Sequence, residues 1–204
     1  KIARIRSKEY LDPKVSNLYG EKNIPIDHII SPEVEVSAAA SRQLRIPGAF
    51  DVKEMAYGKI RLIGVVCDDN CPILETPIRH LTNLFPDLNM TILAIIRGSK
   101  IILPRDGSDV LQSGDRVYFV CDTKHTDRAM SSFGHNEEEV NSVVISGGGN
   151  IGMLLAEDIE SRFDNTVAHI IERDNNQAHH LAEHLSRTTV ICGNSLEADI
   201  LKEA

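Results

Sequence analysis

Residues 143–152 read VVISGGGNIG, an apolar strand that runs directly into a Gly-x-Gly-x-x-Gly turn. Such a turn needs Gly147 to leave the strand sharply and Gly149 to let a pyrophosphate approach the backbone closely. It needs Gly152 so that the next helix can pack on the sheet. A diphosphate would lie on unpaired N–H groups at the positive end of the helix dipole. The stretch therefore predicts a nucleotide-binding turn.

The sequence around the turn supports this prediction. The apolar stripe expected of a helix lying on a sheet follows at once, at Ile151, Leu154, Leu155 and Ile159. A second strand at 166–171 ends in Glu172, about 20 residues beyond the last glycine, where an acid accepts hydrogen bonds from ribose hydroxyls. Because a carboxylate there repels a 2′-phosphate, NAD or an adenine nucleotide is favoured over NADP. The alternative is a Rossmann-like turn that binds nothing.

A third strand at 189–192, then Gly193–Asn194–Ser195 and a helix through Leu201, continue the same unit. It has about half the strands of a complete nucleotide-binding fold. The residues after the second strand include His180–His184, which fits the His-x-x-Glu-His pattern of one class of zinc peptidases. A third ligand and a cleft would also be required. We interpret His179, His180 and His184 as surface residues of the second helix, with Leu181 and Leu185 facing the sheet.

Composition places the chain among soluble globular proteins, with 42% hydrophobic and 25% charged residues in 204. This length suits one large or two small domains, and no apolar run is long enough to span a membrane. A net charge of −8 argues against nucleic acid or an anionic lipid surface as the main partner. The chain begins at Lys1 without a methionine and stops at Ala204, so we expect it to be part of something longer.

The cysteines contain no Cys-x-x-Cys pair, and no His or Cys pair stands nearby to complete a tetrahedral metal site. We therefore expect reduced thiols, as in a cytosolic protein. The four positions are Cys67, Cys71, Cys121 and Cys192.

The N-terminal quarter looks like the end of an α/β unit without its beginning. Residues 2–6 alternate like a strand, a polar helical stretch around 10–19 follows, and 26–30 is a second apolar run. Ser31–Pro32–Glu33 reads as an N-cap, a first-turn proline and an acid that complements the helix dipole. The helix that they open runs through Leu44 and stops at Pro47–Gly48.

From about residue 57 the pattern changes to short strands and turns. The expected elements are a strand at 59–67, a short helix from Thr76–Pro77 to Pro86, a hairpin of 91–97 and 100–103 joined by Gly98–Ser99, and a strand at 116–121. They form a small α+β unit without a catalytic constellation, since its acids lie mostly in turns. An acidic linker, 133–141, leads into the glycine turn.

This order of parts resembles the TrkA family of potassium-uptake regulators, which are built from RCK (regulator of potassium conductance) domains. The stretches that carry the likeness are Ala3–Arg6 with Tyr10–Leu11, Ile29–Glu33, Ala94–Gly98 through Ile102–Pro104, Gly114–Tyr118, the glycine turn with Leu155–Ala156, and Gly193–Ser195 with Leu201–Ala204. The resemblance implies an α/β protein in which partial Rossmann-like units flank a small α+β subdomain of the RCK C-terminal type. Residues 1–56 would end a first Rossmann subdomain, 57–136 would form the C-terminal subdomain, and 137–204 would begin a second Rossmann subdomain.

The resemblance also implies the roles of individual residues. Gly147, Gly149, Asn150, Ile151 and Gly152 would hold the diphosphate. The adenosine ribose would lie at Glu172, Arg173 would reach the phosphates or the adenine, and Gly193 and Asn194 would border the adenine side. The family pattern usually has Gly–Asp where this chain has Gly193–Asn194, so an acceptor is kept and a charge is lost.

In such proteins the nucleotide regulates and does not react. The resemblance thus implies a cytoplasmic, non-enzymatic subunit, peripheral to the inner face of the cell membrane, that forms a dimer or ring and docks on a membrane potassium transporter. NAD, NADH, ATP or ADP would shift the transport gate by their difference in affinity between two states. Two alternatives remain: a fragment of an NAD-dependent oxidoreductase, and an assembly module with a vestigial nucleotide site.

Overall fold

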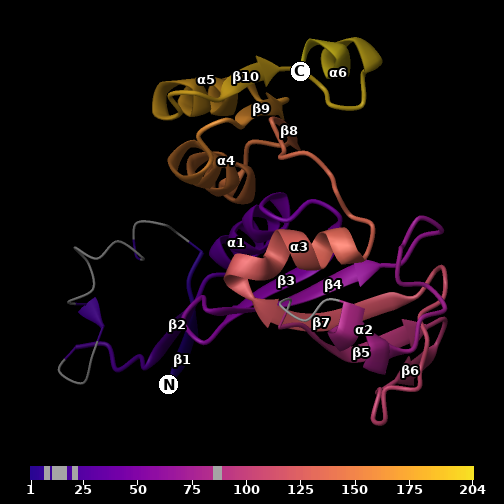
Figure 1. The fold of residues 1–204 in the computed structure, drawn as a ribbon. Coiled ribbons are helices and arrows are strands. Elements are labelled where there is room, and N and C mark those ends of the chain that lie inside the picture. Colours follow the sequence, from indigo (N-terminus) through magenta and orange to yellow (C-terminus); the bar gives the residue numbers. More distant parts are fainter. Residues whose placement is uncertain (7–9, 11–17, 20–22, 85–88) are drawn as a thin grey trace. The chain divides into compact units, whose positions relative to one another are not determined.

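The computed structural model describes residues 1–6, 10, 18–19, 23–84 and 89–204. These residues form two compact units (Figure 1). The first, which we call the terminal unit, joins Lys1–Ser41 to Asn141–Ala204, and the second, the central unit, is Arg42–Val140. Among the described residues, no helix is long and apolar enough to cross a membrane.

The terminal unit contains a parallel three-stranded sheet in the order β10-β9-β8. Its strands are β8 (Ser142–Ser146), β9 (Val167–Glu172) and β10 (Thr189–Cys192). Helix α4 (Asn150–Arg162) connects the first two strands and α5 (Asn175–His184) the last two, and α6 (Ala198–Glu203) follows. The predicted α/β class is confirmed, since a parallel sheet with helical crossovers is the Rossmann-type arrangement.

Burial explains why these helices lie on this sheet. Ile145 and Ile170 of the strands are buried together with Ile159 of α4 and Leu181 of α5. The predicted stripe on α4 is wrong at its first position, because Ile151 is 41% exposed. Gly152, Ala156 and Ile159 are the buried residues of that helix, so its first turn approaches the sheet through a glycine.

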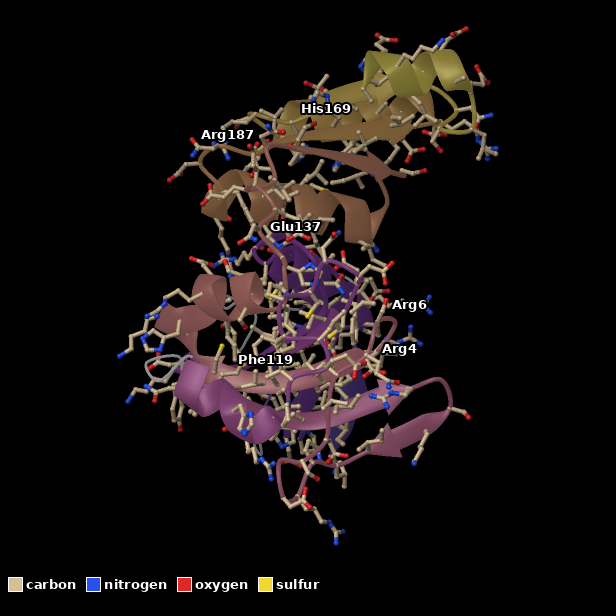
Figure 2. The ribbon with its side chains drawn as sticks, turned by 45° about the vertical axis from the view of Figure 1, so that its right-hand side comes forward. Arg4, Arg6, Phe119, Glu137, His169 and Arg187 are labelled. Carbon is tan, nitrogen blue, oxygen red and sulfur yellow. The ribbon has the colours of Figure 1, made fainter. Side chains whose placement is uncertain are left out.

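The end of α4 is fastened to the connection before β10 by a reciprocal pair of side chains. Arg187, labelled in Figure 2, donates to the carbonyl oxygens of Phe163 at 2.7 Å and Glu160 at 2.9 Å. In return, the Glu160 carboxylate accepts from the N–H groups of Arg187 at 2.7 Å and Thr188 at 2.8 Å. Two carbonyls at the end of α4 thereby gain a donor that the helix itself does not supply.

The N-terminal segment of this unit holds β1 (Ile2–Arg4) and β2 (His28–Ile30), which pair in parallel, and α1 (Pro32–Leu44). Helix α1 begins at the predicted proline, but the predicted cap is not formed, because Ser31 Oγ is buried without a hydrogen-bond partner among the described residues. Ser41 of α1 donates to Asp158 of α4. Most of the helical stretch predicted around 10–19 lies outside the described residues.

The central unit is built on a five-stranded antiparallel sheet in the order β3-β4-β7-β5-β6. Its strands are β3 (Ala49–Met55), β4 (Ile60–Val66), β5 (Thr91–Arg97), β6 (Lys100–Ile102) and β7 (Arg116–Asp122). The predicted hairpin is confirmed, with Arg97 paired to Lys100 across the Gly98–Ser99 turn. Helix α2 (Ile78–Leu84) is also found, while Pro86, its predicted stop, lies outside the described residues.

Three elements of this unit were not anticipated from the sequence. Strand β3 pairs with β4 from Ala49 to Met55, so the expected start of the subdomain at residue 57 falls between two paired strands. After β7, the 3-10 turn η3 (Thr123–His125) leads into α3 (Thr126–Ser132). The Phe133 ring that follows α3 stacks on Phe119 of β7, at 4.8 Å between centroids, in the apolar core. Phe119 is labelled in Figure 2.

The cysteines are free thiols, as expected. Cys67, Cys71 and Cys121 are buried in the core of the central unit, and Cys192 is exposed at the end of β10.

Candidate functional site

The glycine turn between β8 and α4 has the geometry that its sequence predicts. Gly147 has a φ of +98°, a left-handed conformation that side chains rarely adopt. A Cβ on Gly152 would lie 2.1 Å from the Gly147 carbonyl oxygen. The helix can therefore pack this closely on the turn only if residue 152 is glycine. A Cβ on Gly149 would meet nothing within 4 Å. Gly149 therefore leaves open space on the side where a ligand would approach.

The first N–H groups of α4 face this opening without protein acceptors. No hydrogen bond from the N–H of Gly149, Asn150 or Ile151 is formed within the described residues, and the first helical bond is donated by Met153 to the Gly149 carbonyl. Gly149, Asn150 and Ile151 are also exposed. Unpaired N–H groups at the start of a helix, here one of 13 residues, are suited to hydrogen-bond an anion.

A cavity of about 530 Å³ lies over these groups. Its lining includes every residue predicted to hold a diphosphate. The full set is Glu33, Ile145, Ser146, Gly147, Gly149, Asn150, Ile151, Gly152 and Leu155. The structure thus brings the five predicted positions of the turn together around one opening.

Glu172 lies at the end of β9, on the other side of the turn. Its Oε2 accepts from the Gly148 N–H at 2.7 Å and its Oε1 from the Asp174 N–H at 2.8 Å. These hydrogen bonds, the one from Asp174 first, hold the pKa of the Glu172 carboxyl below its usual range. The side chain is therefore an anion that keeps lone pairs for further donors, such as a pair of ribose hydroxyls.

Glu33 is a residue of this site that the sequence did not indicate. It comes from the first turn of α1 and lines the same cavity. Its Oε2 is buried without a hydrogen-bond partner among the described residues, and its Oε1 lies 3.7 Å from Arg6 Nε. Only the folded chain reveals it, because more than a hundred residues separate Glu33 from the glycine turn.

The remaining predicted residues lie at the neighbouring strand ends. Gly193 follows β10 and donates its N–H to the Glu172 carbonyl at 2.9 Å. Asn194 uses its side-chain oxygen to accept from the Leu196 N–H at 3.1 Å, so it shapes the loop after β10. Arg173 is exposed and does not line the cavity.

Two further contacts tie the strand ends together. Ser195 Oγ accepts from Ser146 Oγ at 2.6 Å, which joins the loop after β10 to the end of β8. Gln177 Nε2 donates to the Gly148 carbonyl at 2.7 Å. Both contacts link residues distant in sequence, and the only sequence signal was that Ser146 and Ser195 adjoin the two glycine-containing turns.

The histidines of the His-x-x-Glu-His pattern are exposed on α5, as predicted. The rings of His180 and His184 stack with centroids 4.1 Å apart, and His184 Nδ1 is within 2.7 Å of the His180 carbonyl. Among the described residues, no group of three or more His, Cys, Asp or Glu side chains is placed to hold a metal ion.

Comparison with known proteins links both units to one family. Residues 62–134 match the TrkA-C domain and residues 143–204 match the TrkA-N domain. Over its whole length the chain is 41% identical to the Trk system potassium uptake protein TrkA of Azorhizobium caulinodans and covers 44% of that protein. It is 34% identical to the Haemophilus influenzae TrkA, again over its whole length, and covers 43% of it. The chain thus spans less than half the length of these relatives.

A solved structure of the GsuK channel bound to NAD has the same fold, with a TM-score of 0.54 over 99% of this chain and 33% of the channel chain. The sequence identity is 12%, so this likeness concerns the fold alone.

Proposed function

The chain belongs to the TrkA family of potassium-uptake proteins, and we propose that it binds NAD(H) or an adenine nucleotide at the glycine turn to regulate potassium transport. The observation that carries the proposal is the exposed row of unpaired N–H groups at the start of α4, together with the Glu172 carboxylate that accepts from the Gly148 N–H of the same turn. A diphosphate fits the first feature and a ribose fits the second.

The nucleotide would act as a regulator of an attached transporter. The relatives are named as potassium uptake proteins. From this family membership we propose that the chain acts in the cytoplasm as a peripheral partner of a membrane potassium transporter, in an oligomer such as a dimer or ring. A ligand can move such an assembly between two states only by binding one of them more tightly.

The domain organisation that we propose follows from the family. Residues 137–204 begin a nucleotide-binding Rossmann subdomain, and residues 1–44, through α1, end a preceding one. The α+β subdomain between them extends from β3, near Ala49, through α3, because β3 belongs to its sheet. Both Rossmann pieces then have partners elsewhere in a TrkA protein.

The GsuK structure supports NAD as a ligand to test first, since that channel shares this fold and binds NAD. ADP and ATP carry the same adenosine diphosphate group and are tested beside it.

The decisive experiment is calorimetric titration of NADH, NAD, ADP and ATP into the full-length protein and its Glu172→Gln variant. We expect binding that weakens at least about tenfold in the variant, because the amide lacks the charge that ribose hydroxyls and the Gly148 N–H share. Glu183→Gln, on the exposed face of α5, removes the same charge away from the turn and should bind as wild type.

Potassium uptake by cells that carry each variant then tests the regulatory role. No binding of any of the four nucleotides by folded protein would refute nucleotide sensing and leave an assembly module as the better account. Turnover of NADH would instead favour the oxidoreductase alternative.

A further inference from the structure

Both polar backbone groups of Gly148, at the centre of the turn, are held by side chains. Its N–H donates to Glu172 Oε2 and its carbonyl accepts from Gln177 Nε2, each at 2.7 Å. Gly148 is buried, and a Cβ there would lie 2.1 Å from Leu181 Cδ1 of α5. The start and the buried face of α5 therefore fix where Gly148 can lie.

These contacts close into a ring of hydrogen bonds. Glu172 Oε1 accepts from the Asp174 N–H at 2.8 Å, and Asp174, the N-cap of α5, accepts from the Gln177 N–H at 2.8 Å. Gln177 then reaches back to the Gly148 carbonyl and completes the ring.

The ring is an altered capping box. In a capping box, a Gln three residues after the N-cap binds the N-cap's own N–H. Here the Asp174 N–H is taken by Glu172, so the Gln177 side chain is free to bind another residue. Its amide N–H donates to the Gly148 carbonyl of the glycine turn, 29 residues earlier in the chain.

Two consequences follow for a ligand. The Gly148 N–H is occupied, so a diphosphate must use the N–H groups of Gly149, Asn150 and Ile151. The Gly148 peptide is also fixed before the ligand binds, so binding does not have to include the entropy loss of ordering the turn.

We propose that Gln177 is a positioning residue of the nucleotide site, which holds the glycine turn in its diphosphate-binding conformation through the Gly148 carbonyl. The inference rests on the proposed function, and it assigns the recognition of diphosphate, not of adenosine, to this side chain.

The test compares Gln177→Ala and Gln177→Glu with wild type in the full-length protein, by titration with NADH, ADP and adenosine. Loss of one neutral hydrogen bond corresponds to about a three- to tenfold weaker affinity for NADH and ADP. Adenosine, which has the ribose without a phosphate, should bind each variant as it binds wild type. Amide exchange of the Gly148 N–H in the ligand-free protein should become faster in both variants.

Glutamate separates hydrogen bonding from packing, because it has the size of glutamine but presents only acceptors to the Gly148 carbonyl at neutral pH. Gln43→Ala is the matched control, since Gln43 Nε2 donates to the Phe50 carbonyl at 2.6 Å in the central unit. It removes the same kind of hydrogen bond and should leave all three affinities unchanged.

The inference would be overturned if both Gln177 variants bound NADH and ADP with wild-type affinity, or if they lost affinity for adenosine as much as for NADH and ADP. Either result would leave the proposed function standing. Wild-type affinity in Gln177→Glu with a loss in Gln177→Ala would assign the side chain a packing role and overturn the inference too. A wild-type protein that binds neither NADH nor ADP would refute the proposed function, and this inference with it.

Discussion

Alanine substitutions at Gly149 and at Gly152 should affect different properties, although both glycines belong to one turn. Gly149 has a φ of −69° and a ψ of −171°, which any residue adopts, and a Cβ there would meet nothing within 4 Å. At Gly152 the added Cβ would lie 2.1 Å from the Gly147 carbonyl oxygen and 3.2 Å from Ile145 Cγ2. We expect the first change to affect the ligand and the second to affect the fold.

The magnitudes follow from these contacts. For Gly149→Ala, the weaker N-cap costs about 0.5–1 kcal/mol, and the smaller entropy of the unfolded chain offsets this cost by about 0.4–1 kcal/mol. Its free energy of unfolding should stay within about 0.5 kcal/mol of wild type. For Gly152→Ala, the obstacle is a backbone carbonyl that cannot rotate away. Because the contact would be only 2.1 Å, we take the overpacking cost from the upper part of its usual range, about 2–3 kcal/mol. This cost exceeds the roughly 1 kcal/mol helix preference for alanine, so we expect a net loss of about 1–2 kcal/mol.

The assay pairs urea unfolding, followed by circular dichroism, with titration of NADH and ADP. Gly149→Ala should unfold like wild type yet bind at least about tenfold more weakly, because its methyl group occupies the space that a diphosphate must enter. Gly98→Ala is the control for stability alone. Gly98 has a φ of +60° in the hairpin of the central unit, so alanine there is strained while the nucleotide affinity should not change.

A Gly149→Ala protein that binds nucleotide like wild type would show that the diphosphate does not lie on this turn. A Gly152→Ala protein as stable as wild type would show that α4 does not pack on the turn through this glycine.

Three further predictions concern carboxylates. Burial acts to raise the pKa of Glu160, but the N–H groups of residues 186–188 and the Thr188 hydroxyl hold this pKa below its usual range. The ionised carboxylate therefore stabilises the folded protein fully above about pH 4.3, the pKa of an unfolded Glu. This stabilisation is lost as the pH falls through the lowered pKa of the folded state. Glu160→Gln should therefore lower the free energy of urea unfolding by about 2 kcal/mol at pH 7 and by less at pH 3, and an equal loss at both would contradict the assignment. Asp115 is 1% exposed and accepts hydrogen bonds from Arg97 at 2.7 and 2.8 Å. Asp115→Asn should therefore lower the free energy of urea unfolding by about 3 kcal/mol. A decrease below about 1 kcal/mol would argue against a stabilising pair. Glu33→Gln should raise the affinity for ADP and ATP about two- to tenfold in titrations with a chelator present, and unchanged affinities would place the phosphates away from α1.

Local pattern was enough to predict the strand, turn and helix around Gly147, because each signal lies within a few residues of the next. The same holds for the hairpin at Gly98–Ser99 and for the start of α1 at Pro32. Strand β3 was missed because it is an edge strand whose exposed end carries Lys53 and Glu54, so its apolar pattern is interrupted. Only its pairing with β4 defines it as a strand.

Helix α3 was missed for a different reason. Its sequence, TDRAMSS, is short and mostly polar, and it is held by the burial of Ala129 and Met130 in a core made by distant strands. Tertiary packing, more than intrinsic propensity, stabilises so short a helix.

The site shows the same limit in its side chains. The glycines and Glu172 belong to a fixed spacing that a sequence displays, whereas Gln177 and Glu33 act through contacts that spacing does not encode. Nothing in the sequence singled out Gln177, and Glu33 was predicted only to complement the helix dipole. Each has a second environment that only the fold supplies: the Gly148 carbonyl for Gln177, and the cavity over the glycine turn for Glu33.

We expect these two residues to act on a bound nucleotide in opposite directions. Gln177 presets the turn for a diphosphate, which favours every nucleotide that carries one. Glu33 adds a negative charge to the same cavity, and its repulsion grows with the charge of the ligand. In NADH the diphosphate is flanked by two riboses, whose hydroxyls can donate to a carboxylate, whereas ATP brings a further terminal phosphate. The glycines would bind the diphosphate of NADH and of ATP alike. Selectivity at this turn would therefore come mainly from the Glu33 carboxylate, which repels the more highly charged ATP.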